Sequence, residues 1–184
     1  MSPAPVAVRA ARPEEARILV PLLAEILIDC VENGASVSFM APLTASRAEA
    51  FWRGVVAGVE QGDRVLLVAE TGDTVVGTVQ VVFAQQENQP HRAEIAKMLV
   101  RSSARRRGVG AALMRAAEEA ARAAGKTLLV LDTVPGESGE RLYERVGWTR
   151  VGVIPDYALW PDGRLCDTAV YYKRVPSSDQ SAER

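Results

Sequence analysis

The spacing of apolar residues along the chain changes several times, and each change predicts a different element. Residues 6–9 form a short β-like run. Apolar positions at helical spacing follow over residues 13–34 and again over residues 44–62. Pro21 removes a backbone hydrogen bond inside the first of these helices, so we expect a kink or a restart there. The chain is therefore predicted to begin with a strand and two helices.

Runs rich in Val and Leu dominate the rest of the chain. Two of them, at residues 65–69 and 75–83, flank Thr71-Gly72-Asp73, which is typical of a β-hairpin. Over residues 109–124, apolar positions recur at i, i+3 and i+4 and predict a helix. The same patterns predict strands at 93–100, 127–131, 149–154 and 168–173, and a short helix at 138–146.

The order of these elements predicts the class of fold. Hairpins are combined with a strand–helix–strand crossover, which favours a mixed α/β (α+β) architecture over a doubly wound parallel sheet. We expect a twisted, mostly antiparallel sheet of about seven strands flanked by about four helices. At 184 residues the chain has the size of one domain, which we place at residues 1–175, followed by a polar tail at 176–184.

Composition and charge narrow the class of function. Lysine plus arginine number 22 and aspartate plus glutamate 23, so the chain lacks the basic excess of a nucleic-acid-binding protein. No apolar run reaches the ~20 residues of a membrane helix, and none near the start has the length of a signal-peptide core. Cys30 and Cys166, with a single histidine, suit neither a zinc cage nor a disulfide framework. We expect a cytoplasmic protein with no metal, nucleic-acid or membrane partner.

The most informative segment joins the predicted strand 93–100 to the next helix. Gly108 and Gly110 remove side chains where a ligand must approach the backbone. Free N–H groups at residues 108–112, together with the helix dipole, favour a phosphate or pyrophosphate. Positive charge is added by Arg105, Arg106 and Arg107.

Three interpretations of this segment compete. A solvated basic turn that caps a helix is the simplest. A Rossmann or Walker loop is disfavoured, because Leu113 stands where a third glycine would follow Gly110 and no Gly-Lys-Ser/Thr is present. The third interpretation is the pyrophosphate cradle of an enzyme that uses acyl-CoA.

Two motifs carry a resemblance to a known family. Arg105-x-x-Gly108-x-Gly110-Ala111 resembles the acyl-CoA-binding motif of the GNAT superfamily of N-acyltransferases, and Leu142-Tyr143-Glu144-x-x-Gly147-Trp148 resembles its Tyr…Gly-Phe/Trp element. The resemblance implies a GNAT-like fold, an acetyltransferase activity and acetyl-CoA as co-substrate. Many members carry an Asn seven residues before the tyrosine. This chain has Gly136 there, and we expect Ser138 to substitute for that contact. The other residues assigned to acetyl-CoA are Met98, Leu99, Val100, Arg105, Arg106, Arg107, Gly108, Val109, Gly110 and Ala111.

The resemblance also implies roles for three side chains. Tyr143 stands where the family places the proton donor to the departing thiolate, and a phenol keeps its proton at neutral pH. Asp132 ends a buried strand and is the first candidate for the base, with Glu94 as the second. Other readings stay open. Tyr143 also suits a core aromatic, Asp132 a turn cap and Glu94 a surface ion pair, and both carboxylates suit an ammonium group of the substrate.

A more specific resemblance concerns the acceptor. Residues 34–40, 92–94, 131–133, 149–152 and 157–165 are similar to a branch of the superfamily that acetylates a β-lactam amino-acid toxin. This implies a small-molecule amine, an amino-acid-like toxin or antibiotic of the tabtoxinine-β-lactam type, and a role in antibiotic resistance. We expect the acceptor pocket to be lined by Ser36, Phe39, Met40 and Tyr157.

The reaction is expected to be a direct transfer in a ternary complex, because Cys166 has no neighbouring base that would support a covalent acyl-enzyme. Two other functions stay open. One is acetylation of a protein lysine or N-terminus, and the other is a non-catalytic acyl-CoA-binding sensor. A homodimer is equally open, since no feature of the sequence decides the oligomeric state.

Overall fold

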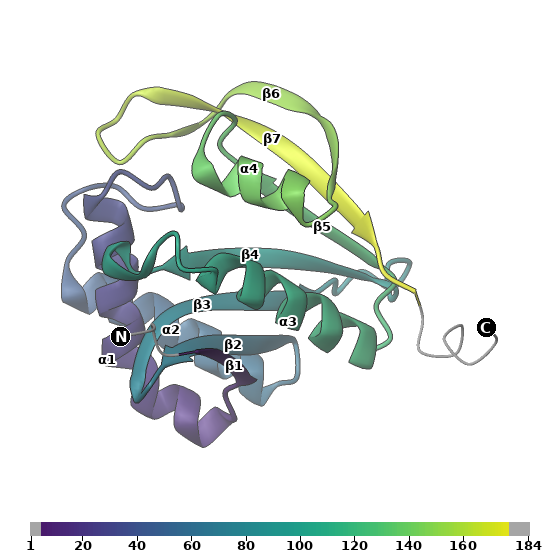
Figure 1. Cartoon of the computed structure of the whole chain (residues 1–184), viewed down its shortest axis with the longest axis horizontal. Coiled ribbons are helices and arrows are strands. Elements are labelled where there is room, and N and C mark those ends of the chain that lie inside the picture. Colours follow the sequence, from purple (N-terminus) through teal and green to yellow (C-terminus); the bar gives the residue numbers. More distant parts are fainter. Residues whose placement is uncertain (1–4, 177–184) are drawn as a thin grey trace.

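The computed structural model describes residues 5–176, and its elements follow the predicted order (Figure 1). Residues 177–184, most of the predicted polar tail, lie outside the described residues. The elements are β1 (Val6–Ala10), α1 (Pro13–Glu32), α2 (Ala45–Glu60), β2 (Arg64–Thr71), β3 (Thr74–Phe83), β4 (Arg92–Val100), the short 3-10 helix η1 (Ser102–Ala104), α3 (Val109–Ala123), β5 (Leu128–Thr133), α4 (Ser138–Arg145), β6 (Thr149–Leu159) and β7 (Leu165–Arg174).

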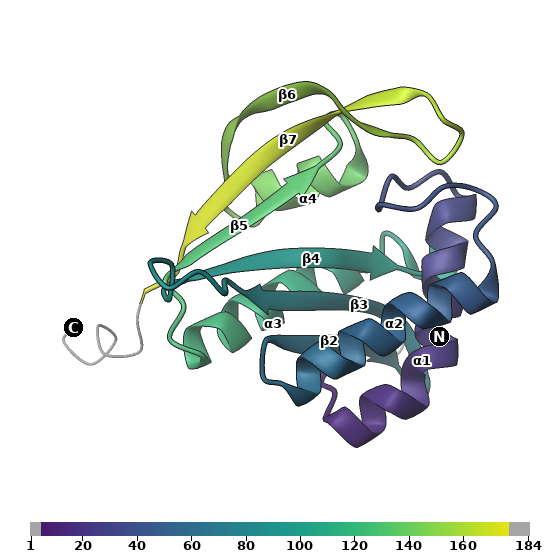
Figure 2. The same ribbon diagram turned by 180° about the vertical axis from the view of Figure 1, so that it is seen from behind.

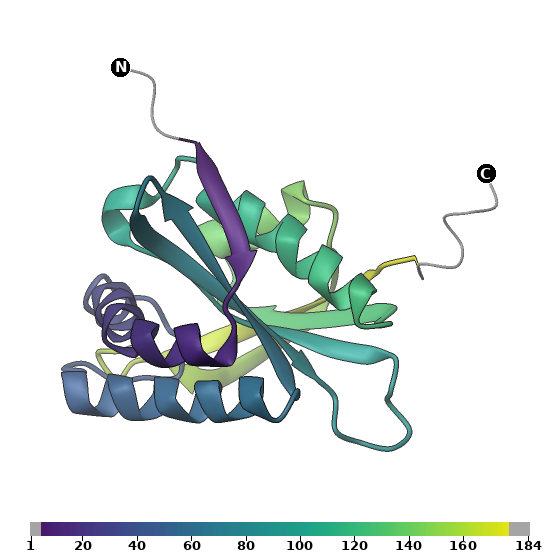
Figure 3. The same ribbon diagram turned by 90° about the horizontal axis from the view of Figure 1, so that it is seen from below.

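The strands form one 7-stranded sheet in the order β1-β2-β3-β4-β5-β7-β6. Among these strands every neighbouring pair is antiparallel except β4 and β5, which run parallel. Helices α1 and α2 cover one face and α3 covers the other (Figure 3). The predicted fold class is therefore confirmed.

Two apolar cores hold the layers together. One lies between the sheet and helices α1 and α2 and contains Trp52, Leu23 and Ile26, all fully buried. The other lies under α3 and α4 and contains Leu113 and Met114. Each such side chain contributes roughly 1.5–3 kcal/mol on burial, so the helices are firmly fixed to the sheet. The loops at their ends are positioned accordingly.

The structure resolves two local expectations. α1 continues through Pro21 as a single helix that bends along its length (Figure 2), which agrees with the expected kink and not with a restart. β6 and β7 extend to Leu159 and Leu165, well beyond the predicted strand ends at 154 and 168. A register shift between Ile154 and Ala158 interrupts the alternation of side chains, which hides the second half of β6 from a pattern search.

The parallel pair β4–β5 opens toward one end. Residues 92–94 of β4 pair with residues 128–130 of β5, and the pairing stops there. Beyond this point β4 stays on β3 while β5 follows β7, so the two strands diverge (Figure 1). The divergence leaves an opening in the middle of the sheet, next to the loop that leads into α3.

Candidate active site

A β-bulge in β4 decides which side chains face this opening. The register of β3 against β4 shifts between Thr78 and Gln80, and Lys97, inside the bulge, has a φ of +50°. The extra residue reverses the alternation of side chains along the strand. Accordingly, Ile95 packs into the core under α3, whereas Leu99 packs into the core against α1 and α2. An unbroken strand would hold both on one face.

Three charged side chains gather at the opening. Asp132 and Glu94 are exposed, and Asp132 accepts a hydrogen bond from Thr168 Oγ1 at 3.1 Å. Lys97 is partly buried, and its Nζ donates to Ser38 Oγ at 3.0 Å. Burial lowers the pKa of Lys97, while the charges of Asp132 and Glu94 act to raise it. The ammonium of Lys97 therefore lies within electrostatic reach of both carboxylates. We name this group of three side chains, where β4 and β5 diverge, the cleft.

Tyr143 projects from α4 into the apolar layer beside this cleft. It is 7% exposed, and its ring lies near those of Trp148 and Tyr171, at centroid distances of 6.3 and 6.4 Å. Burial raises the pKa of Tyr143 well above its usual value, and the charge of Asp132 raises it further. The phenol keeps its proton at neutral pH as a result. Tyr143 is thus a core aromatic that also feels the charge of Asp132, and the two interpretations are compatible.

The start of α3 forms the predicted anion cradle. Its N-cap, Gly108, has a φ of +80°, a conformation that favours glycine. The first N–H groups of a helix have no helical partner. Ala112 N–H, however, donates to Gly108 O at 3.0 Å. The predicted row of free donors at 108–112 is therefore one residue too long.

Several residues assigned to acetyl-CoA also pack against other parts of the protein. Leu99 and Val109 are buried, so their side chains pack inside the protein. A Cβ at Gly110 would lie 2.8 Å from Leu142 Cδ2 and 3.7 Å from Met98 Sδ. Glycine at position 110 therefore lets α4 approach α3, a reason that the sequence interpretation did not include.

The three arginines of the loop differ in their surroundings. Arg105 Nε donates to Val100 O at 3.3 Å, and its Nη2 donates to Cys30 Sγ at 3.9 Å, so this side chain folds back on the loop. Arg106 and Arg107 are exposed, and neither side chain forms a hydrogen bond or ion pair with another described residue. The latter two are better placed to meet an anion from solvent, and Arg105 shapes the loop.

The predicted acceptor residues have different surroundings. Ser36 Oγ donates to Leu159 O at 2.9 Å. Phe39 packs edge-on against Phe51 of α2, with ring centroids 5.3 Å apart, and so anchors its loop to α2. The remaining two side chains lie largely in solvent, with exposed fractions of 37% for Met40 and 59% for Tyr157.

The loop that carries Ser36 is nevertheless fixed over the cleft side of the sheet. Besides the Ser36 bond, Ala41 N–H donates to Pro161 O at 3.0 Å, in the turn between β6 and β7. The same loop reaches β4 through the bond between Ser38 and Lys97. Segments far apart in the sequence therefore enclose the cleft together.

Ser138 is the first residue of α4 and is exposed. Nearby, Gly136 N–H donates to Glu140 Oε2 at 2.6 Å, which satisfies the helix start and lowers the pKa of Glu140. Gly136, in place of the Asn common in the family, therefore contributes its backbone to a cap of α4.

Sequence reasoning did not single out Lys97 or Thr168, and it included Ser38 only as part of the segment 34–40. Lys97 lies in a segment whose sequence predicts one regular strand. No local sequence signal indicates the bulge that turns Lys97 toward Glu94. Thr168 reaches Asp132 only because β7 lies beside β5.

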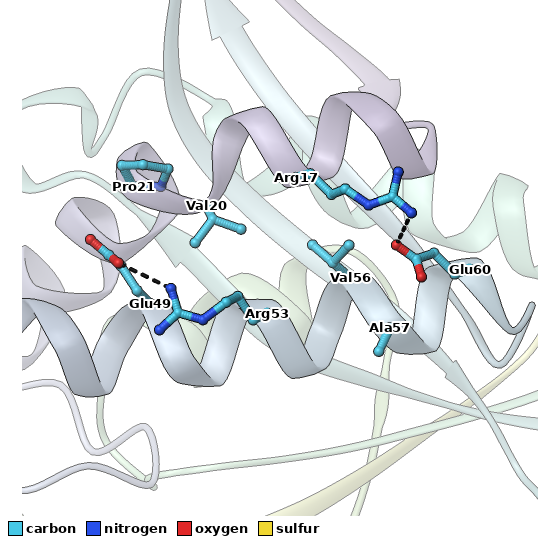
Figure 4. A pocket seen from close by; sticks show the side chains of 8 residues that line it. All are labelled: Arg17, Val20, Pro21, Glu49, Arg53, Val56, Ala57 and Glu60. Atoms are coloured by element: carbon cyan, nitrogen blue, oxygen red, sulfur yellow. Dashed lines mark hydrogen bonds and ion pairs between the residues drawn. The ribbon is translucent and has the colours of Figure 1, made fainter.

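A hollow of about 450 Å³ lies elsewhere, between α1 and α2 (Figure 4). The ion pair Arg17–Glu60 at 2.6 Å joins α1 to α2 beside it, and the pair Arg53–Glu49 at 3.1 Å lies along α2. None of the predicted site residues lines it. It is therefore separate from the cleft between β4 and β5.

Comparison with known proteins identifies the family. Residues 25–148 match the acetyltransferase (GNAT) family, which is well over half of the chain. The chain therefore belongs to the GNAT family of acetyltransferases, whose co-substrate is acetyl-CoA. At this level the predicted superfamily, enzyme class and co-substrate are confirmed.

Individual relatives agree with this assignment. The chain is 33% identical over 106 residues to an uncharacterized N-acetyltransferase from the hisH-hisA intergenic region of Azospirillum brasilense, a match that covers 56% of this chain and 61% of that relative. The chain thus matches less than two thirds of that relative's length. A ribosomal-protein-alanine N-acetyltransferase from Brucella melitensis shares the fold, with a TM-score of 0.77, 24% identity, and coverage of 92% of this chain and 99% of that one. An acetyltransferase from Salmonella typhimurium, solved with its cofactor acetyl-CoA, has a TM-score of 0.76 at 18% identity and covers 93% and 94% of the two chains.

Within residues 5–176, no helix is both long and apolar enough to cross a membrane. Within the same residues, no group of three or more His, Cys, Asp and Glu side chains is arranged to hold a metal ion.

Proposed function

We propose that this protein transfers an acetyl group from acetyl-CoA directly to the amine of a small molecule. The observation that carries the proposal is the electrostatic influence of Asp132, at the end of β5, on the phenol of Tyr143 in α4. Burial raises the pKa of Tyr143, and the charge of Asp132 raises it further. A protonated phenol and a carboxylate at one cleft are what acid–base catalysis of acyl transfer requires.

The residues of the start of α3 suit acetyl-CoA. Gly108, in its left-handed conformation, and the free N–H groups that follow offer an anion site for a pyrophosphate, and Arg106 and Arg107 add charge. When bound, acetyl-CoA supplies an acetyl thioester. Backbone N–H groups of residues 98–100 are the proposed donors to the thioester oxygen.

The chain's own side chains then move two protons. Asp132, or Glu94 in its place, accepts a proton from the acceptor's ammonium so that the nitrogen can attack the carbonyl carbon. The new carbon–nitrogen bond forms as the carbon–sulfur bond breaks, and Tyr143 donates its phenolic proton to the sulfur. The nitrogen then gives up its second proton, which restores the Tyr143 phenol, and Asp132 releases the proton it accepted to solvent, which its exposure permits.

The enclosure of the cleft supports a small acceptor over a protein. The loop of residues 34–42 is hydrogen-bonded to the end of β6 through Ser36 and to the turn between β6 and β7 through Ala41, a closed arrangement that suits a small acceptor better than an extended peptide. The segments that resemble the tabtoxin resistance protein favour an amino-acid-like acceptor, such as tabtoxinine-β-lactam. Ser36, Met40 and Tyr157 are the proposed side chains around it, and the proposed setting is antibiotic or toxin resistance in the cytoplasm.

The test is thiol release from acetyl-CoA against amino acids, polyamines, aminoglycosides, β-lactam amino acids and peptides. We expect a small amine to react, and Tyr143→Phe to lower kcat by about 10²-fold or more, because general acid catalysis contributes that much. Acetyl-CoA affinity, measured by calorimetry, should stay unchanged in the variant. Selective reaction of peptides would contradict the proposal, and so would tight acetyl-CoA binding without any turnover.

A further inference from the structure

Lys97 presents an ammonium group that forms no direct ion pair with a carboxylate among the described residues. Its only side-chain hydrogen bond among the described residues joins Nζ to Ser38 Oγ at 3.0 Å. An ammonium has three donors, so two remain for another partner. Although Asp132 and Glu94 both influence it, neither forms an ion pair with it in this part of the chain.

The conformation of Lys97 is energetically unfavourable for the folded protein. Lys97 and Ser38, the two residues joined by the hydrogen bond, both have a positive φ, +50° and +75°. Residues other than glycine adopt this conformation only at an energetic cost, and such strain collects at binding and catalytic sites. Lys97 is also partly buried, which disfavours a charge without a partner. Packing alone does not require a lysine here, since an apolar side chain would avoid that cost.

The charges around Lys97 are complementary to one class of molecule. Two carboxylates, Asp132 and Glu94, lie on the same face of the sheet as a single ammonium. An α-amino acid carries an ammonium and a carboxylate separated by one carbon atom. Its amine would lie against the carboxylates, and its carboxylate would lie against Lys97 and Ser38. A simple amine without a carboxylate would leave Lys97 unpaired.

We propose that Lys97 and Ser38 bind the carboxylate of an α-amino-acid acceptor and thereby direct its α-amine toward Asp132 and Tyr143. The inference rests on the proposed acetyl transfer and adds the class of acceptor and the position of the acetylated nitrogen. Ser38 assists as a hydrogen-bond partner that holds Lys97 in place. Charge-assisted hydrogen bonds to a carboxylate are among the strongest in proteins, so this contact would dominate acceptor recognition.

The test compares alanine, serine, threonine, glutamate and lysine with their α-carboxamides as acceptors at saturating acetyl-CoA. We expect the amino acids to react with a higher kcat/KM than the carboxamides. Lys97→Met should lower kcat/KM for the amino acids roughly 10- to 100-fold, mainly through KM, and change that for the carboxamides little. Lys97→Arg should restore part of the loss. Lys126→Met is a matched control, because Lys126 Nζ contacts Pro90 O at 2.7 Å, away from the cleft.

The outcomes separate this inference from the proposed function. Equal reaction of amino acids and carboxamides, with Lys97→Met lowering both alike, would overturn the role of Lys97 and leave acetyl transfer standing. Reaction of other amines but of none of these amino acids would do the same. Absence of any acetylated amine would overturn both. An unchanged melting temperature in Lys97→Met shows that the comparison concerns binding and not folding.

Discussion

At the scale of single residues, the carboxylates of Asp132 and Glu94 differ in how firmly neighbouring groups hold them. Asp132 is held by Thr168 Oγ1 at 3.1 Å at the end of β5, close enough for its charge to raise the pKa of Tyr143. Glu94 lies at the last paired position of the parallel strands, exposed. A base works best when its geometry is fixed, which favours Asp132. Glu94 then suits attraction of the acceptor's ammonium.

This difference predicts unequal effects of two matched substitutions. Asp132→Asn should lower kcat about 10²-fold or more, because the amide accepts no proton, while KM for the acceptor changes little. Glu94→Gln should raise KM for the acceptor and affect kcat less. Steady-state kinetics of both variants with one acceptor decides the assignment. A larger loss of kcat in Glu94→Gln would reverse the roles of the two carboxylates.

At the scale of elements, local patterns predicted most of the fold but not the cleft. The hairpin around Gly72 and the start of α3 at Val109 have local signals in turn residues and apolar spacing, and both are present. The bulge at Lys97 has no such signal, because it arises from the pairing of β4 with β3 and from the two cores on either side. Lys97 was therefore missed, although its neighbours Glu94 and Met98 were named.

The start of α3 supports a prediction about the anion cradle. Nothing lies within 4 Å of a Cβ at Gly108, so a side chain fits there, and Asn and Asp tolerate its positive φ better than most residues. Gly108→Asp should weaken CoA binding about tenfold or more relative to Gly108→Asn, because the two differ only in a negative charge at the helix start. Calorimetry with CoA at low and high salt measures this, and the gap should shrink with salt. Equal affinity of the two variants would argue against a pyrophosphate at this position.

At the scale of the whole molecule, the cleft depends on contacts between distant segments. Ser36 and Leu159 meet across 123 positions of sequence, and Thr168 meets Asp132 across 36. No local pattern contains such information. The candidate residues Tyr143 and Asp132 were found from the family resemblance, whereas Phe39 was assigned to the pocket although it packs on α2. The roles of all three residues stay predictions, because no local pattern contains the contacts that place them.

The sheet and its two helical layers also bury tyrosines whose titration should limit stability at high pH. Burial raises the pKa of both Tyr143 and Tyr171 well above the ordinary value for tyrosine, which is about 10. Below that pH both residues are protonated in the folded and the unfolded chain, so their contribution is constant. Above it the unfolded chain releases protons that the folded chain retains, so stability falls as pH rises. Melting temperatures from pH 8 to 11 should fall less steeply in Tyr143→Phe than in the parent protein, whereas Tyr157→Phe, at a residue 59% exposed, should follow the parent. Equal slopes in all three proteins would mean that the Tyr143 phenol is not protected from titration, and its role as the retained proton donor would lose its physical basis.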